Sequence, residues 1–319
     1  MSPPRRRTGR KALTALLPLL LLLVLAVVSV TAWLVYSATR PPQRAYLVTP
    51  EKFLRLSDRG LKATEETWAN RDGTRARGWL VRGAEGAPAV LLLHGYGADR
   101  SWLLNLGVKI NETTNMTVLL PDLRGHGQSP SVASSSFGWA ESDDALAALE
   151  YLRGLKSPQG RALAGPALGV YGVELGSYAA LSAARRDPAV RAVVLDSVPD
   201  SADDALAGAV RDRTGFDNRL LQALARLGTR VYFAGRYKSD AACTLAEGLG
   251  DRQVLLLSGE GAGRLKQTTE TLANCFPVRA NVETHTDLPL TGLALASASP
   301  EEDEKYDRRL IDFFDRTLR

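Results

Sequence analysis

The stretch Gly172-Val173-Glu174-Leu175-Gly176 decides the fold of this chain. It has the spacing of the Gly-x-Ser-x-Gly nucleophile elbow, with a glutamate in place of the serine. The apolar run before it, 167–171, predicts a short buried strand, and the alanine-rich run after it, 177–186, predicts a helix. A strand, a tight glycine turn and a helix in this order place the side chain of Glu174 at the top of a parallel sheet, beside a helix N-terminus.

Apolar runs that alternate with amphipathic ones surround this elbow from about residue 62 onward. Such alternation is typical of a mostly parallel sheet that is covered by helices on both faces, which is an α/β fold. Residues 199–248 interrupt the alternation with short helices, where a small lid would lie. The expected strands are 65–68, 75–81, 89–93, 117–120, 167–171, 192–195, 254–257 and 279–284, and the expected helices are 101–108, 142–155, 177–186 and 301–318.

The N-terminal region predicts attachment to a lipid bilayer. Residues 12–39 carry no charge, and a bilayer is crossed by about 20 apolar residues. A basic cluster precedes this segment and favours a cytoplasmic N-terminus, with the main domain on the other side of the membrane. A cleaved signal peptide is the alternative, with Val30-Thr31-Ala32 as its cleavage site, but the apolar run continues to Val35 and we favour an uncleaved anchor. The basic cluster consists of Arg5, Arg6, Arg7, Arg10 and Lys11.

Charge and cysteine content limit the remaining possibilities. The formal net charge of +5 equals the charge of the basic cluster, so the rest of the chain is neutral and offers no basic face for nucleic acid. Cys243 and Cys275 can form one disulfide outside the cytoplasm or remain two buried thiols, and we favour the thiols. No cofactor and no metal site is expected. The predicted organisation is a basic tail at 1–11, an anchor at 12–39, a linker at 40–60 and one domain at 61–319.

Four features together resemble the α/β-hydrolase superfamily over roughly residues 60–318. His94-Gly95-Tyr96-Gly97 resembles the oxyanion turn, and 122–129, from Asp122 to Ser129, resembles the Asp-x-Arg-Gly-x-Gly-x-Ser loop. The elbow glycines and the pair Asp196-Ser197, which follows an apolar run, are the other two. With the predicted anchor, the chain is most similar to small membrane-tethered serine hydrolases of the BEM46-like kind.

The resemblance implies a triad of serine, acid and histidine, with an oxyanion hole made by two backbone N–H groups. Those groups would belong to Leu175 and Tyr96, and a change of side chain leaves backbone donors in place. The serine position holds Glu174. The acid position, at the end of 259–262, holds alanine, and the histidine position falls on Gly292-Leu293. In this register all three members of the triad are replaced.

Two functions follow as alternatives. The chain has three histidines, and His94 and His126 belong to the motifs above, which leaves His285 as the candidate base. An active hydrolase of carboxylic esters or similar bonds would use Glu174 with His285, oriented by Asp196 or by Glu260. We favour the other alternative, a non-catalytic homologue that acts as a binding or scaffolding module and retains a pocket for a small acyl or ester ligand. Glutamate is longer than the usual nucleophile, and attack geometry tolerates little misplacement.

Overall fold

The computed structural model describes residues 6–56, 63–128, 130–292 and 299–319. Within these residues the chain forms an 8-stranded sheet in the order β1-β2-β4-β3-β5-β6-β7-β8. The strands β3 to β8 are parallel, and the hairpin β1–β2 pairs antiparallel with β4. The strands are β1 (Ala63–Ala69), β2 (Arg75–Val81), β3 (Ala87–Leu93), β4 (Thr117–Pro121), β5 (Ala164–Val173), β6 (Val190–Asp196), β7 (Gln253–Gly259) and β8 (Val282–Leu288).

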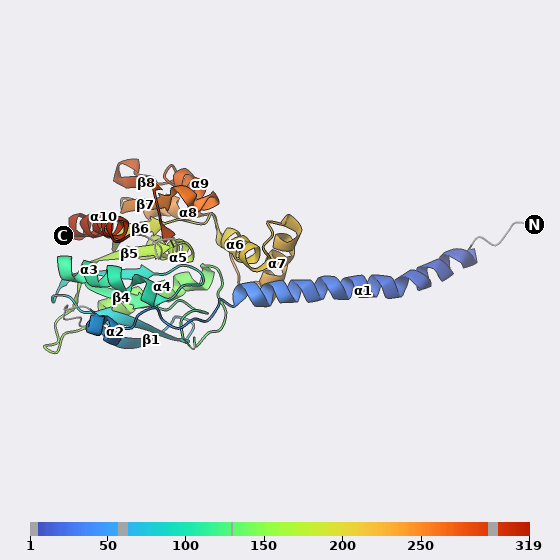
Figure 1. Ribbon diagram of the computed structural model, residues 1–319, viewed down its shortest axis with the longest axis horizontal. Coiled ribbons are helices and arrows are strands. Elements are labelled where there is room, and N and C mark those ends of the chain that lie inside the picture. Colours follow the sequence, from blue (N-terminus) through green and yellow to red (C-terminus); the bar gives the residue numbers. More distant parts are fainter. Residues whose placement is uncertain (1–5, 57–62, 129, 293–298) are drawn as a thin grey trace, which may run out of the picture.

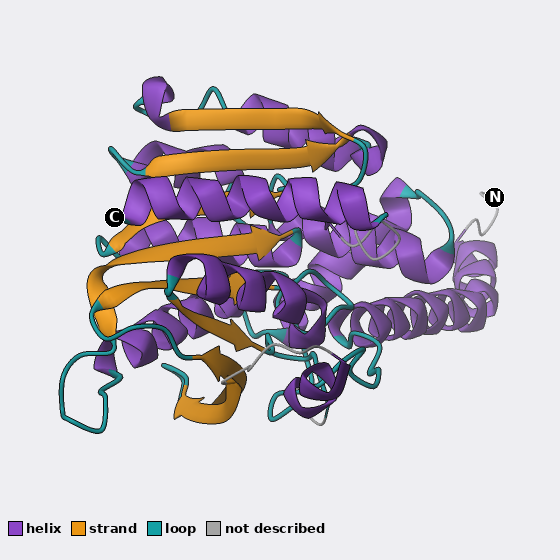
Figure 2. Cartoon of the chain, turned by 60° about the vertical axis from the view of Figure 1, so that its left-hand side comes forward, coloured by secondary structure: helices purple, strands orange, loops and turns teal. Residues whose placement is uncertain are grey.

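Helices cover the sheet on both faces, as the alternation of the sequence predicted (Figure 2). Successive residues of a strand point to opposite faces, so Leu91 and Leu93 belong to one core and Val90 and Leu92 to the other. The first core packs mainly against α4 (Trp139–Gly154), α5 (Leu175–Arg186) and α8 (Ala242–Ala246). The second core packs against α3 (Leu104–Thr114) and α10 (Pro300–Leu318).

The N-terminal helix α1 (Arg6–Thr39) projects from this domain (Figure 1). Its segment Leu16–Thr39 is 24 residues long, with a mean hydropathy of 2.6, which is long and apolar enough to cross a membrane. This is compatible with a single-pass anchor or with a signal sequence. Most of the segment is exposed, but Leu34 and Ala38 in its last two turns belong to the first core. The expected linker that follows contains a short helix, α2 (Pro50–Leu56).

The region expected as a lid contains α6 (Ala202–Thr214), α7 (Arg219–Tyr232) and α8. Figure 1 shows α6 and α7 standing out from the sheet beside the domain end of α1. Contacts join α7 to both α1 and α6. Two of the lid helices, α6 and α7, therefore pack against the domain end of the predicted membrane segment.

Two details of the sequence prediction were wrong. The last strand begins at Val282 and not at Arg279, because residues Arg279–Asn281 form a 3-10 turn before β8. The strand is at the edge of the sheet, and its polar alternation is a weak signal. Cys243 and Cys275 are not two thiols but one disulfide, with Cα atoms 5.2 Å apart. It joins α8 to the turn after α9 (Arg264–Leu272), a pairing that two isolated cysteines cannot reveal.

Candidate functional site

The elbow is a strained turn between β5 and α5. Glu174 has φ 49° and ψ −110°, a left-handed conformation that non-glycine residues rarely adopt. A Cβ on Gly172 would lie 2.2 Å from the carbonyl oxygen of Gly176, and a Cβ on Gly176 would lie 2.3 Å from that of Leu93. The backbone is so closely packed that only glycine fits at both positions. The N–H of Glu174 donates to the carbonyl of Asp196 at 2.9 Å, which ties the turn to the neighbouring strand.

Glu174 lines a cleft of about 550 Å³ together with Tyr96 and Leu175. Leu175 is the first residue of α5, and the first N–H groups of a helix have no partner within it. The structure thus brings three of the four candidate residues to one cleft. Most of the other residues that line the cleft come from α6 and from residues 261–265.

Charged side chains at this cleft were missed by the sequence analysis. Asp204 and Arg211 come from α6, and Asp217 comes from the connection to α7. Arg264 donates to Asp204 across the cleft at 2.6 Å. These residues form no motif, and only the packing of the lid on the sheet brings them together.

Tyr96 connects the cleft to the predicted membrane segment. Its hydroxyl donates to the carbonyl of Ala38 in the last turn of α1 at 2.6 Å. Its ring stacks on Phe137 and meets the edge of His126, with centroid distances of 5.8 Å and 5.6 Å. Burial raises the pKa of Tyr96 to about 12, so the hydroxyl stays a donor at neutral pH.

Two histidines are structural, as the motifs predicted. Nδ1 of His94 donates to the carbonyl of Gly95 at 2.8 Å, and Nε2 accepts from the N–H of Leu123 at 3.0 Å. Burial lowers the pKa of His94 to about 4. Burial and the neighbouring His94 lower the pKa of His126 to about 3. Both rings are neutral at physiological pH, and the hydrogen bonds of His94 occupy both of its nitrogens.

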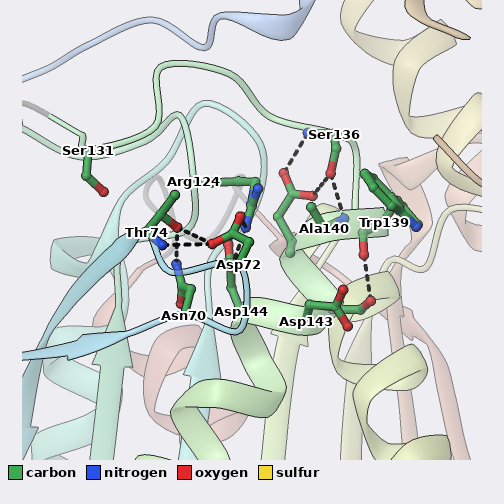
Figure 3. Close-up of polar contacts among 12 residues, drawn as sticks. Asn70, Asp72, Thr74, Arg124, Ser131, Ser136, Trp139, Ala140, Asp143 and Asp144 are labelled. Carbon is green, nitrogen blue, oxygen red and sulfur yellow. Dashed lines mark hydrogen bonds and ion pairs between the residues drawn. The ribbon is translucent and has the colours of Figure 1, made fainter. Parts of the chain in front are cut away.

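The loop that contains His126 is fixed by ion pairs. Arg124 donates to Asp144 of α4 and to Asp72 in the β1–β2 turn, at 2.6 Å and 3.1 Å (Figure 3). The hydroxyl of Thr74 donates to Asp72 in turn. Ser129 at the end of the matching motif lies outside the described residues. The Arg-Gly-His-Gly motif therefore joins the hairpin to α4 and does not contribute to the cleft of Glu174.

His285 is not near the elbow. It lies in β8 opposite Leu257 of β7, and Leu257 lies opposite Asp196 of β6, which lies opposite Val173 of β5. With neighbouring strands about 4.8 Å apart, three steps separate His285 from the end of β5 by about 14 Å. Partial burial and the charge of Arg309 lower the pKa of His285. The structure leaves this imidazole at the outer edge of the sheet.

The carboxylate of Asp196 is buried beneath the elbow and accepts three hydrogen bonds. The hydroxyl of Tyr306 and the N–H of Gly292 donate to Oδ2 at 2.5 Å and 2.9 Å, and the hydroxyl of Ser197 donates to Oδ1 at 2.7 Å. Burial is the main cause that raises the pKa of Asp196, and these donors oppose it. In place of orienting an imidazole, the carboxylate ties α10 and the segment after β8 to the sheet.

The structure describes some of the positions at which the resemblance expects an acid and a base. Glu260 begins a 3-10 turn after β7 and is exposed, whereas Ala262 lines the cleft. A Cβ on Gly292 would lie 3.0 Å from Oε1 of Glu174, so the segment after β8 does pass the elbow. Leu293, the position at which the resemblance expects histidine, lies outside the described residues. Among the described residues no group of three or more His, Cys, Asp and Glu is placed to hold a metal ion.

Comparison with known proteins agrees with this geometry. A family model described as the Alpha/beta hydrolase family matches residues 90–313. An esterase from Pyrococcus furiosus superposes with a TM-score of 0.64 at 18% identity, covering 88% of this chain and 98% of that one. A dienelactone hydrolase from Anabaena variabilis superposes with a TM-score of 0.54 at 17% identity, covering 81% and 100%. At these identities the similarity concerns the fold. No curated protein matches the sequence.

Proposed function

The chain belongs to the Alpha/beta hydrolase family, and we propose that it is a non-catalytic member, a membrane-anchored module that binds a small acyl or ester ligand in the cleft of Glu174. The observation that carries this proposal is the position of the three histidines. His94 and His126 are buried and neutral, and His285 is three strands away from the elbow.

Hydrolysis through a covalent intermediate needs a base that activates water, and general bases contribute about 10² to 10⁴ in rate. A carboxylate at the Glu174 position could act as a nucleophile without a general base, but the acyl group that it acquired would then stay on the protein. A shift that brings His285 to Glu174 would have to cross β6 and β7, whose side chains are packed on both faces. On this argument the cleft at the elbow binds a ligand but does not hydrolyse it.

The cleft retains features that suit a ligand with a carbonyl group. Leu175 and Tyr96 contribute backbone donors of the kind that bind a carbonyl oxygen, and Ala205, Ala209 and Leu265 give apolar walls. A neutral ester or amide fits this combination.

Retention of α1 is the second part of the proposal, and burial of its last turns supports it. Leu34 and Ala38 are 1% and 0% exposed, and the carbonyl of Thr39 accepts from the N–H of Ser135 at 2.7 Å. Cleavage after Ala32 would leave a seven-residue stub, and isolated helices shorter than about 12 residues are marginal. Because the core of the domain includes the end of α1, an uncleaved anchor keeps this part of the core intact.

Activity can be tested on the full chain in detergent micelles with p-nitrophenyl esters and a fluorophosphonate probe. We expect no turnover and no labelling for the wild type, and Glu174→Ser alone should not restore either, because the new serine lacks a base. Steady turnover that both Glu174→Gln and His285→Ala abolish would refute the non-catalytic proposal. Turnover that survives Glu174→Gln would place the active site elsewhere in the chain.

Binding can be tested separately by titrating a fluorescent, non-hydrolysable acyl amide. Ala205→Trp fills the cleft from α6 and should abolish saturable binding. Ala162→Trp is the matched control, because Ala162 is exposed in the loop before β5. Equal binding by both variants would exclude this cleft as the ligand site.

One observation favours an active hydrolase as the second candidate. Glu174 keeps a strained backbone, and such conformations cost about 1 to 3 kcal/mol and tend to occur at functional sites. Under this alternative Glu174 would act as the nucleophile with His285 as its base. The esterase assay of Glu174→Gln and His285→Ala distinguishes the active hydrolase from the non-catalytic module.

A further inference from the structure

Large apolar side chains are exposed on one side of the lid. Phe216, Leu220, Leu227 and Val231 are between 61% and 73% exposed. The last three are seven and four residues apart in α7, so they form one stripe along the helix. Gln222, Ala225 and Thr229 are on the opposite side and are buried against the domain. The helix is amphipathic, and its apolar face points away from the protein core.

This apolar stripe, formed by Leu220, Leu227 and Val231, lies beside the predicted membrane segment. Gly228 packs directly on α1, since a Cβ there would lie 2.6 Å from the side chains of both Thr31 and Val35. Figure 1 shows α7 beside the domain end of α1. A span that starts at Leu16 reaches Val35 after about 20 residues, or about 30 Å of helix, which is the thickness of the hydrocarbon layer. The contact therefore lies where hydrocarbon meets head groups.

The charges near α7 indicate what kind of surface covers the apolar stripe. Between residues 211 and 238 the chain has seven basic and two acidic side chains. Arg219 and Arg230 lie on the flank of the apolar stripe, by helical spacing, and Arg230 also donates to Asp203 at 3.1 Å. A basic amphipathic helix with an apolar face is the pattern of helices that lie in a membrane interface with anionic lipid. A second copy of the chain would instead bring the two basic surfaces together.

We propose that α7 is an interfacial helix whose apolar stripe enters the leaflet next to the domain, beside α1. The helix and the anchor then form two points of attachment, which fix the orientation of the domain on the membrane. Since Arg211 and Asp217 at the lid end of the cleft adjoin α7, the cleft lies at head-group level, within reach of a ligand that partitions into the bilayer. The inference requires α1 to remain in the membrane, but it does not depend on whether the cleft is catalytic.

The test uses the full chain in vesicles of phosphatidylcholine with a minority of phosphatidylglycerol. An environment-sensitive fluorophore is attached to Leu227→Cys, while the native cysteines stay in their disulfide. Val278→Cys is the control, because Val278 is exposed just before β8, at the N-terminal edge of the parallel strands. Tyr96, which contacts α1, follows the opposite edge.

We expect a blue shift and quenching by shallow doxyl lipids at Leu227→Cys and neither at Val278→Cys. Equal spectra at the two positions would overturn the proposal. A blue shift without quenching would also overturn it, since protein and not lipid would then cover the helix. Intact mass of the membrane-bound protein must include α1, and a mature form that begins near Trp33 would remove the basis of the inference.

A second variant does not depend on labelling. Leu227 is 61% exposed in the protein alone, so Leu227→Glu should fold normally. In vesicles we expect α7 to be protected from trypsin in the wild type and in Val278→Glu, and to be cleaved in Leu227→Glu. Equal cleavage of the wild type and of both variants would contradict an interfacial position for α7.

Discussion

Removal of the Tyr306 hydroxyl gives the sharpest test of the polar network beneath the elbow. Tyr306→Phe deletes one donor to the buried carboxylate of Asp196, removes the hydrogen bond between the hydroxyls of Tyr306 and Tyr171, and leaves the ring in place. Hydrogen bonds to charged groups contribute about 1.5 to 3 kcal/mol, and a buried acceptor that loses a donor is not rescued by water. We therefore expect the free energy of unfolding to fall by about 2 kcal/mol at pH 7.

The pH dependence of the decrease in unfolding free energy shows whether the Tyr306 hydroxyl donates to a charged carboxylate or only fills space. Burial raises the pKa of Asp196 above its ordinary value of 3.8. The stability that this group contributes is therefore complete below the unfolded pKa and decreases as pH rises through the folded pKa. Tyr306→Phe raises the folded pKa further, so the difference between variant and wild type should grow as pH rises from about 4.

The assay is urea unfolding of the detergent-solubilised chain, followed by tryptophan fluorescence at several pH values. Tyr232→Phe is the matched control, because Tyr232 is 50% exposed and its change should stay within about 0.5 kcal/mol. Two results would refute the role of the hydroxyl as a donor to an ionised Asp196. One is a decrease in unfolding free energy no larger than that of Tyr232→Phe, and the other is a decrease that is the same at every pH.

Three further predictions concern packing. Gly172→Ala should prevent accumulation of folded protein, because its Cβ would lie 2.2 Å from a backbone oxygen, whereas Gly154→Ala, with no atom within 4 Å, should be neutral or stabilising in thermal unfolding. Reduction of the Cys243–Cys275 disulfide, which closes a loop with a sequence separation of 32, should lower the free energy of unfolding by about 2 to 4 kcal/mol, and an unchanged melting temperature in reductant would contradict this. Gly228→Val should separate α7 from α1 and raise tryptic cleavage of the lid in micelles, and unaltered cleavage would show that the contact does not hold the lid.

The fold was predictable because its signals are local. The elbow glycines are required by backbone contacts at 2.2 and 2.3 Å, and the apolar runs of the central strands follow from burial on both faces. The polar edge strand β8 gave a weaker signal, and its start was misplaced. The contact of Gly228 with Thr31 joins helices that are far apart in sequence, and no periodicity predicts which helix an amphipathic segment will meet.

The site was predictable only as a set of positions. Glu174, Leu175 and Tyr96 meet at one cleft because the backbone of the motif determines where they lie. His285 was a candidate only because the other two histidines had structural roles. The sequence does not reveal the order and register of strands β5 to β8, which place His285 about 14 Å from the end of β5. The donors to Asp196 come from α10 and from the segment after β8, and only the tertiary structure brings them to this carboxylate.

The polar network beneath the elbow is consistent with the proposal that this chain lacks a working triad. A carboxylate that accepts from Tyr306, Gly292 and Ser197 has its oxygens directed at these donors and has little capacity to orient a base. Gly292 also passes so close to Glu174 that any larger residue there would press on its carboxylate. Placing serine at the elbow would therefore supply one group of the three that a triad needs, while the carboxylate of Asp196 remains engaged in holding α10. Under the non-catalytic proposal, esterase activity would require changes at the elbow, after β8 and around Asp196 together, and we therefore expect no single substitution to produce an esterase from this chain.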